Sequence, residues 1–104
     1  MSQTRRIELG NILKSILGNT NTYFQPPENT KLKYPCCIYE LSGYDEKRAN
    51  NKLYGYVKRY QVTFISDNVD NDYYERIMST IPMCKFDRRF IVDNLYHDVF
   101  SIYY

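Results

Sequence analysis

The chain has 104 residues, of which 43% are hydrophobic and 25% are charged, and these values are those of an ordinary globular domain. They argue against a largely disordered chain, and this length supports one hydrophobic core, so we expect a single domain over residues 1–104. The 14 basic and 12 acidic residues give a net charge of only +2, which excludes strong long-range attraction to nucleic acid.

The N-terminal sequence MSQTRRIELG lacks the apolar core of a signal peptide, and no apolar run reaches the roughly 20 residues of a membrane-spanning helix. The cysteines Cys36, Cys37 and Cys84 are odd in number and lack the spacing of a disulfide framework. We therefore expect reduced cysteines in a protein made in the cytoplasm, with no membrane partner.

The first predicted element is a helix over Thr4–Leu17, because apolar residues recur there with helical spacing and a glycine follows. The stretch Asn19–Leu32 contains two prolines and several Asn and Thr residues, so we expect a loop with a short extended piece at Tyr23 and Phe24. The apolar run Tyr34–Leu41 predicts a strand.

The segment Ser42–Leu53 is polar, charged and rich in Gly and Asn, which predicts a long exposed loop. Apolar and polar residues then alternate along Tyr54–Ile65, as in a half-buried strand. The side of this strand that we expect to face the core carries Tyr54, Tyr56, Tyr60, Val62 and Phe64.

A second helix is predicted to begin at Asp70, which has the side chain of an N-cap, and to end at Pro82. Acidic residues gather around its start, namely Asp67, Asp70, Asp72 and Glu75. They lack the spacing and the glycine of an EF-hand loop, so helix capping explains them better than a metal site does.

Two final strands, Met83–Val92 and Leu95–Tyr104, flank the pair Asp93 and Asn94, which tolerates the positive φ angles of a tight turn. This hairpin register predicts two cross-strand pairs, Arg89 with Asp98 and Phe90 with His97.

These elements predict an α+β fold, an antiparallel sheet of about four strands with two helices packed on one face. In the final hairpin the core side is predicted to carry Phe86, Phe90, Val92, Leu95 and Val99. The other face then keeps Ile91, Tyr96, Phe100, Ile102 and Tyr104. The chain has 12 Tyr and 5 Phe, and Tyr is enriched at interfaces, so we predict that Tyr96, Phe100 and Ile102 form an interface between subunits.

No catalytic site is predicted, and neither is a cofactor or a metal. His97 is the only histidine, so a small hydrolase would need it to activate Cys84, and no nucleophile motif surrounds that cysteine. A glycine-rich phosphate loop is absent from the sequence. The segment YGYVKRYQVTF alternates aromatic and basic residues, so a single-stranded nucleic-acid binder is a further alternative.

Four stretches, in this order, resemble the tail-terminator and head-to-tail joining proteins of long-tailed bacteriophages: LKYPCCIYEL, YGYVKRYQVTFIS, DNVDNDYYERI and FDRRFIVDNLYHDVFSIYY. The resemblance spans nearly the whole chain. It implies an α+β fold with helices on one side of an antiparallel sheet, a ring of six copies, and no enzymatic activity.

The resemblance further implies a structural virion protein of the phage neck, assembled in the host cytoplasm, whose ring caps the tail tube and meets the head-completion proteins. DNA then passes through the lumen without specific binding. A head-side connector, or stopper, of the same neck is the alternative within the family. We predict that the polar segment touches the tail tube or the connector through Tyr44, Lys47, Arg48 and Lys52, because its charges cannot be buried unpaired in so small a core.

Overall fold

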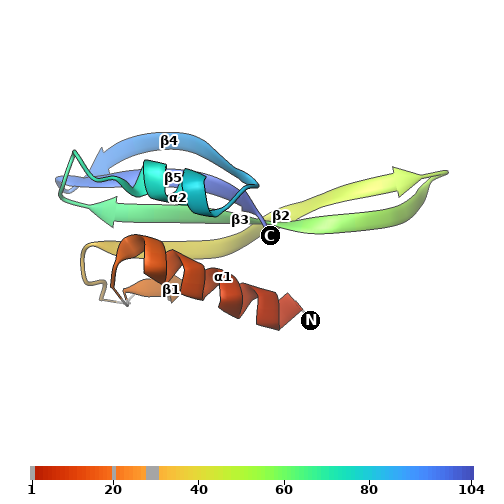
Figure 1. Ribbon diagram of the computed structural model, residues 1–104, viewed down its shortest axis with the longest axis horizontal. Helices are drawn as coiled ribbons and strands as arrows, with labels where there is room; N and C mark the ends of the chain where they lie inside the picture. The colour runs from red at the N-terminus through yellow and green to blue at the C-terminus, as the bar shows by residue number, and fades with distance from the viewer. Residues whose placement is uncertain (1, 20, 28–30) are drawn as a thin grey trace.

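The computed structural model describes residues 2–19, 21–27 and 31–104, with the side chains of residues 2–4 and of Tyr54 left out. These residues form two helices and five strands, in the order α1 (Ser2–Leu17), β1 (Thr22–Phe24), β2 (Cys36–Ala49), β3 (Lys52–Ser66), α2 (Tyr73–Thr80), β4 (Cys84–Val92) and β5 (Leu95–Tyr103). The five strands form one sheet in the order β1-β2-β3-β5-β4, in which β1 alone pairs in parallel (Figure 1).

The predicted α+β class is confirmed, with two helices and a mostly antiparallel sheet. The sheet is larger than the expected four or so strands, because Tyr23 and Phe24 belong to the short strand β1 that pairs with β2. Residues 20 and 28–30 of the predicted loop Asn19–Leu32 lie outside the described residues. Neither helix has the length and apolarity needed to cross a membrane, as far as the described residues go.

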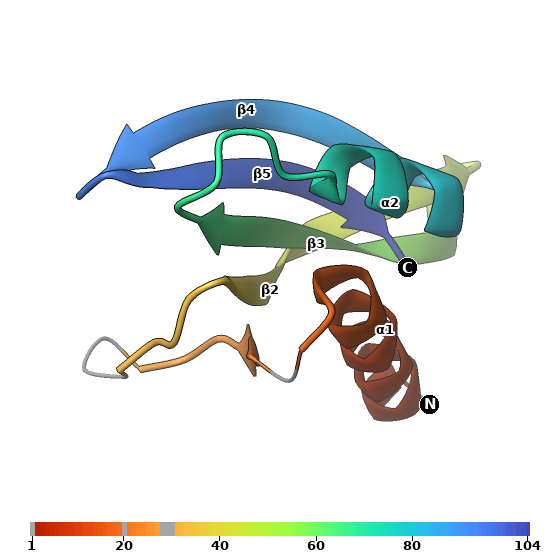
Figure 2. The same cartoon turned by 60° about the vertical axis from the view of Figure 1, so that its left-hand side comes forward.

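The core lies between the sheet and the two helices, which cover the same face of the sheet (Figure 2). Phe64 of β3 is at its centre, stacked on Tyr73 of α2 with ring centroids 5.0 Å apart and meeting Phe100 of β5 edge to face at 5.9 Å. The helices contribute Leu9, Leu13, Ile16, Leu17, Tyr73 and Ile77 to this cluster, and the strands contribute Cys37, Tyr39, Tyr60, Val62, Phe64, Phe100 and Ile102. The predicted core side of β3 is therefore confirmed for Tyr60, Val62 and Phe64.

The final hairpin has the predicted register, with Arg89 opposite Asp98 and Phe90 opposite His97. Its faces, however, are not those predicted. Phe100 and Ile102 point toward the helices and are fully buried in the core. Two causes combine: α2 lies over this part of the sheet, and a β-bulge between Phe86 and Arg88 reverses the alternation along β4.

Because of that bulge, Phe86 lies on the helix side, with its ring 5.3 Å from Phe100, whereas Phe90 lies on the other side, stacked on His97 at 4.7 Å. The prediction that Phe86 and Phe90 share the core face is thus wrong. Val99 of that predicted set is buried on the side away from the helices, and Val92 is exposed.

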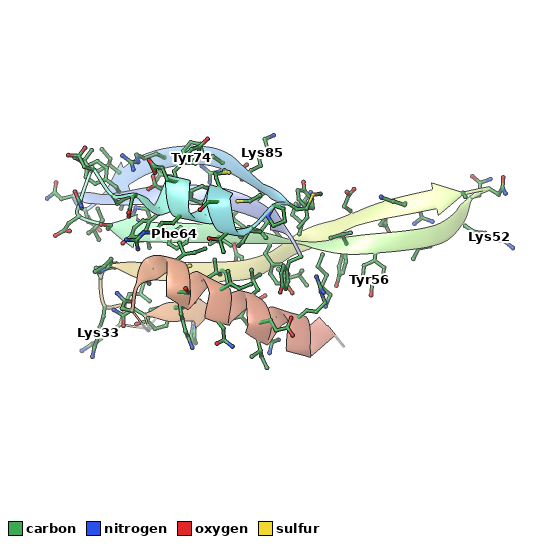
Figure 3. The ribbon with its side chains drawn as sticks, in the orientation of Figure 1. Lys33, Lys52, Tyr56, Phe64, Tyr74 and Lys85 are labelled. Atoms are coloured by element: carbon green, nitrogen blue, oxygen red, sulfur yellow. The ribbon has the colours of Figure 1, made fainter. Side chains whose placement is uncertain are left out.

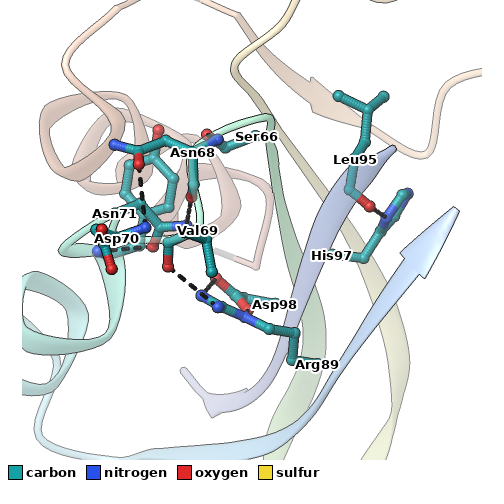
Figure 4. A network of polar contacts seen from close by, with 10 residues as sticks. Ser66, Asn68, Val69, Asp70, Asn71, Arg89, Leu95, His97 and Asp98 are labelled. Carbon is teal, nitrogen blue, oxygen red and sulfur yellow. Dashed lines mark hydrogen bonds and ion pairs between the residues drawn. The ribbon is translucent and has the colours of Figure 1, made fainter. Parts of the chain in front are cut away.

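The second helix begins at Tyr73, three residues after the predicted N-cap Asp70. Asparagine side chains hold the preceding loop in Asx turns (Figure 4). The Asp70 amide donates to Asn68 Oδ1 at 3.0 Å, and the Tyr73 amide donates to Asn71 Oδ1 at 3.4 Å. Asp70 therefore belongs to the loop and does not cap the helix.

The segment Ser42–Leu53 is not a loop. It continues β2 and begins β3, and the two strands join through only Asn50 and Asn51, whose φ angles are 53° and 64°. Asparagine tolerates these angles, which a two-residue hairpin turn of this type requires. Residues 42–57 thus form a β-hairpin arm that projects from the body and makes the molecule 50 Å long against widths of 26 and 23 Å (Figure 1).

Candidate functional site: the arm and the free sheet edge

The arm is a ribbon of two strands with both outer edges free. Strand β1 pairs with β2 only at residues 37–39, and β5 pairs with β3 only from Arg59 onward. No third strand lies beside residues 42–57 in the described part of the chain. The backbone N–H and C=O groups of both edges are therefore open to another strand. A two-stranded hairpin is marginally stable by itself in water, so a partner that pairs with one edge would stabilise the arm.

One face of the arm is aromatic. Tyr44 and Tyr56 meet edge to face across the two strands with ring centroids 5.8 Å apart, and with Leu53 and Glu46 they line a shallow hollow. Tyr44, Leu53 and Tyr56 are 54%, 52% and 56% exposed. Lys52 lies at the tip of the arm, far from both helices (Figure 3), and the exposure of the three apolar residues shows that the described body of the subunit leaves this face uncovered. Exposed tyrosines beside an apolar hollow are typical of a protein interface.

The four residues predicted to bind a partner, Tyr44, Lys47, Arg48 and Lys52, all lie on the arm and are all exposed. They are distributed around it and do not form one patch. Tyr44 is on the aromatic face, and Arg48 contacts Glu46 at 3.4 Å. Lys47 alternates onto the opposite face, and Lys52 is at the tip beside the turn.

Leu53 and Tyr56 were not among the predicted binding residues, although they form the aromatic face with Tyr44. The prediction that Tyr56 faces the core is wrong, because the structure exposes its ring. The side chain of Tyr54, also predicted to face the core, lies outside the described residues. The missed signal was the pair Asn50 and Asn51, which marks a tight turn in the middle of the supposed loop.

The base of the arm is fixed by Arg59. Its Nε donates to Ser42 Oγ at 3.3 Å, and the same hydroxyl donates to the Arg59 carbonyl at 3.1 Å. The guanidinium lies against Gly43, where a Cβ atom would be only 2.6 Å from Nη2. A β-bulge between Leu41 and Gly43 sits at the same place. A side chain at position 43 would therefore have to move the Arg59 guanidinium, the far end of a flexible side chain, away from this contact.

The second unpaired surface is β4, at the far edge of the sheet from β1 (Figure 2). Among the described residues no strand lies beyond it. Its apolar residues are unusually exposed, with Ile91 at 61%, and charges alternate with them. Antiparallel pairing directs only part of the β4 backbone toward β5, so the rest of its N–H and C=O groups face outward. Such an edge is a template for another strand.

The predicted interface of Tyr96, Phe100 and Ile102 is not supported as a surface. Phe100 and Ile102 are fully buried within the subunit and cannot contact another one without unfolding. Tyr96 is half-buried, and the Arg89 guanidinium lies 5.3 Å from the centre of its ring. A subunit interface must therefore use other residues.

Cys84 and His97 cannot act as a catalytic pair in this fold. Cys84 lies opposite Ile102 on the helix side of the sheet, whereas His97 lies opposite Phe90 on the other side. His97 Nδ1 is 3.1 Å from the carbonyl oxygen of Leu95. Burial raises the pKa of the Cys84 thiol to about 11, so the thiolate is scarce at neutral pH.

Nor does the aromatic alternation of YGYVKRYQVTF offer several rings to stacked bases. Tyr56 is exposed, but Tyr60 is buried in the core and is not available for stacking. In the described residues no group of three or more His, Cys, Asp or Glu side chains is arranged to hold a metal ion.

No protein-family model matches the chain, and no curated protein sequence matches it.

Proposed function

We propose that this chain is a structural subunit that assembles with copies of itself into a ring, and that the ring is the tail terminator of a long-tailed bacteriophage. In this role the ring, of about six copies in the family that the sequence resembles, caps the tail tube and joins it to the head-completion proteins of the neck.

The observation that carries the proposal is the arm. It is a projecting ribbon with free strand edges, and one of its faces is aromatic and exposed, built from Tyr44, Leu53 and Tyr56. Exposed apolar surface of this kind marks a site of protein contact. A projecting arm also lets one subunit reach its neighbour in a ring.

Two further observations support a structural role over the alternatives. The separation of Cys84 from His97 removes the one hydrolytic pair that the sequence offered. The burial of Tyr60 leaves too few exposed rings on β3 for a base-stacking platform. The α+β fold with both helices on one face agrees with what the resemblance implies.

The basic residues of the arm, Lys47, Arg48 and Lys52, give it a surface that can contact the tail tube or the connector. In a ring with this net charge, DNA passes through the lumen without a specific site.

Sedimentation velocity and negative-stain imaging test the proposal. The purified chain is examined alone and after mixing with purified tail tubes. We expect closed rings, either free in solution or at one end of each tube. A chain that stays monomeric in both conditions, or that instead binds short single-stranded DNA tightly at physiological salt, contradicts the proposal. Binding to the head-side portal and not to tubes would favour the connector role.

A further inference from the structure

We propose that the arm of one copy adds as a strand to the free edge of β4 in the next copy, and that this contact joins successive subunits. The inference rests on the proposed self-association and goes beyond it by naming both halves of the contact.

The two surfaces need the same kind of partner. The outer edge of β2 along residues 42–49 and the outer edge of β4 both present unpaired backbone N–H and C=O groups. Strand addition satisfies both rows at once, because main-chain hydrogen bonds form along the whole contact.

The lengths of the two edges match. Strand β4 has nine residues, or roughly 30 Å at about 3.4 Å per residue. The unpaired part of β2, residues 42–49, extends roughly 27 Å by the same rise. The arm can therefore cover nearly all of the exposed edge of a neighbouring subunit.

The charges are complementary. Asp45 lies opposite Val57 in the arm, and Arg88 lies opposite Val99 in the final hairpin, so both side chains are on the sheet side away from the helices. Neither of the two forms an ion pair within the described part of the subunit, where the only charged pairs are Arg48–Glu46, Arg76–Asp72 and Arg89–Asp98. An added strand whose faces continue those of the sheet can place Asp45 beside Arg88.

The next residues give the direction of the added strand. With Asp45 beside Arg88, a parallel strand brings Glu46 beside Arg89 on the helix side. An antiparallel strand in that register brings Glu46 beside Asp87 instead, whose carboxylate accepts a hydrogen bond from Ser101 on the side away from the helices, so Glu46 gains no arginine. The charge pattern thus favours parallel addition, with two acidic residues of the arm along two arginines of the edge.

The contact is between unlike surfaces, since the arm and β4 are different parts of the subunit (Figure 1). Contacts of this type repeat head to tail and close into a ring when the rotation allows it. Pairing of two arms with each other would instead produce a two-fold dimer and leave β4 free. The occupant of the β4 edge is therefore a second copy of this chain, contacting it through the arm.

Charge reversal tests the contact. Asp45→Arg and Arg88→Asp each place like charges together, so each variant alone should lose assembly, with at least a tenfold rise in the concentration needed for half-assembly. A one-to-one mixture of the two variants should assemble again, because every arm then meets an oppositely charged edge when the two variants alternate. The double variant Asp45→Arg with Arg88→Asp should also assemble.

Asp67→Arg and Lys33→Asp are matched controls, because both residues are exposed and lie outside the arm and β4. They should leave assembly unchanged. Sedimentation velocity measures assembly, and circular dichroism verifies that each variant is folded.

Normal assembly of both single variants overturns this inference and leaves the proposed ring intact. Loss of assembly in only one variant, or in both without rescue by mixing, also overturns it, since the two residues then do not face each other. A parent chain that never assembles, alone or on tail tubes, instead contradicts the proposed function itself.

Discussion

Arg89 of β4 and Asp98 of β5 form a two-point ion pair across the final hairpin, with Nη2 donating to Oδ2 at 3.0 Å and Nε donating to Oδ1 (Figure 4). Arg89 Nη1 also donates to the Val69 carbonyl at 3.2 Å. The hydrogen bond to Asp98 raises the pKa of Arg89. This arginine therefore ties the edge strand both to β5 and to the loop that precedes α2.

Removal of Asp98 should destabilise the subunit. Its side chain is 5% exposed, and that of Arg89 is 35% exposed. We expect Asp98→Ala to lower the free energy of unfolding by about 2 kcal/mol, because it removes a charged hydrogen bond and leaves Arg89 partly buried without its partner. Urea denaturation measures the change. Asp70→Ala is the control, since Asp70 is exposed and should cost no more than about 0.5 kcal/mol. Equal effects would contradict this role of the pair.

Phe100 should prove to be a core residue in a stability measurement. Its ring contacts Phe64 and Phe86, and it has no exposed surface. We expect Phe100→Ala to cost about 3–5 kcal/mol, the range for truncation of a buried aromatic side chain. Tyr96→Ala, at a half-buried position on the same strand, should cost clearly less. Chemical denaturation of both variants measures the free energies of unfolding. A small loss for Phe100→Ala would contradict the burial of Phe100 in the core.

The basic residues of the arm should matter for tail completion and not for the stability of the subunit. Replacing Lys47, Arg48 and Lys52 with Ser should leave the melting temperature within a few degrees, because exposed charges contribute about 0.5 kcal/mol or less each. The single ion pair lost, Arg48 with Glu46, is solvent-exposed and contributes little. Tail completion should nevertheless fail in a complementation assay with a terminator-deficient phage. Full restoration of infectious particles by this variant would place the contact with the tube or connector elsewhere.

Alkaline pH should destabilise the fold. Burial raises the pKa of Cys36 and of Cys84 from 9.0 to about 11, and burial also raises the pKa values of the core tyrosines Tyr39, Tyr60 and Tyr73. Between pH 9 and about 11 the unfolded chain loses these protons while the folded chain keeps them. The folded state then binds more protons than the unfolded state, so the free energy of unfolding must fall as the pH rises through this range.

Urea denaturation at a series of pH values measures this fall. Cys84→Ser removes one of the buried thiols, and its stability should depend less steeply on pH above 9 than that of the parent. A flat profile for the parent up to about pH 11 would contradict the assigned burial of these groups.

The two tight turns show what local sequence could and could not predict. The sequence predicts a turn at Asp93 and Asn94 because apolar strands flank them on both sides. Asn50 and Asn51 adopt nearly the same φ angles, although the polar residues around them predict a loop. The arm is solvated on both faces, so burial imposes no apolar alternation on its strands, and the main signal for a strand is missing there.

The faces of β4 and β5 depended on structure distant in sequence. The alternation of β5 is compatible with either face toward the core, and the position of α2 decides between them. The bulge after Phe86 then places Phe86 and Phe90 on opposite faces of the sheet, and no local sequence pattern predicts this bulge. The four predicted binding residues lie on the segment that forms the arm, whereas Leu53 and Tyr56 join Tyr44 on one face only through the pairing of the two strands.

The bulge at the base of the arm also constrains how such a chain can change in length. Tyr44 shares the side of Leu41 only because the bulge inserts one extra residue between them. Deletion of Ser42 alone would remove the bulge and leave Tyr44 on the side of Leu41 and Tyr56 by regular alternation, whereas deletion of both Ser42 and Gly43 would turn Tyr44 to the opposite side and exchange the two faces of the ribbon. Insertions toward the tip preserve the faces only when each strand gains residues in twos. The reach of the arm can thus lengthen or shorten over evolution in discrete steps of two residues per strand, while the body that carries it stays the same.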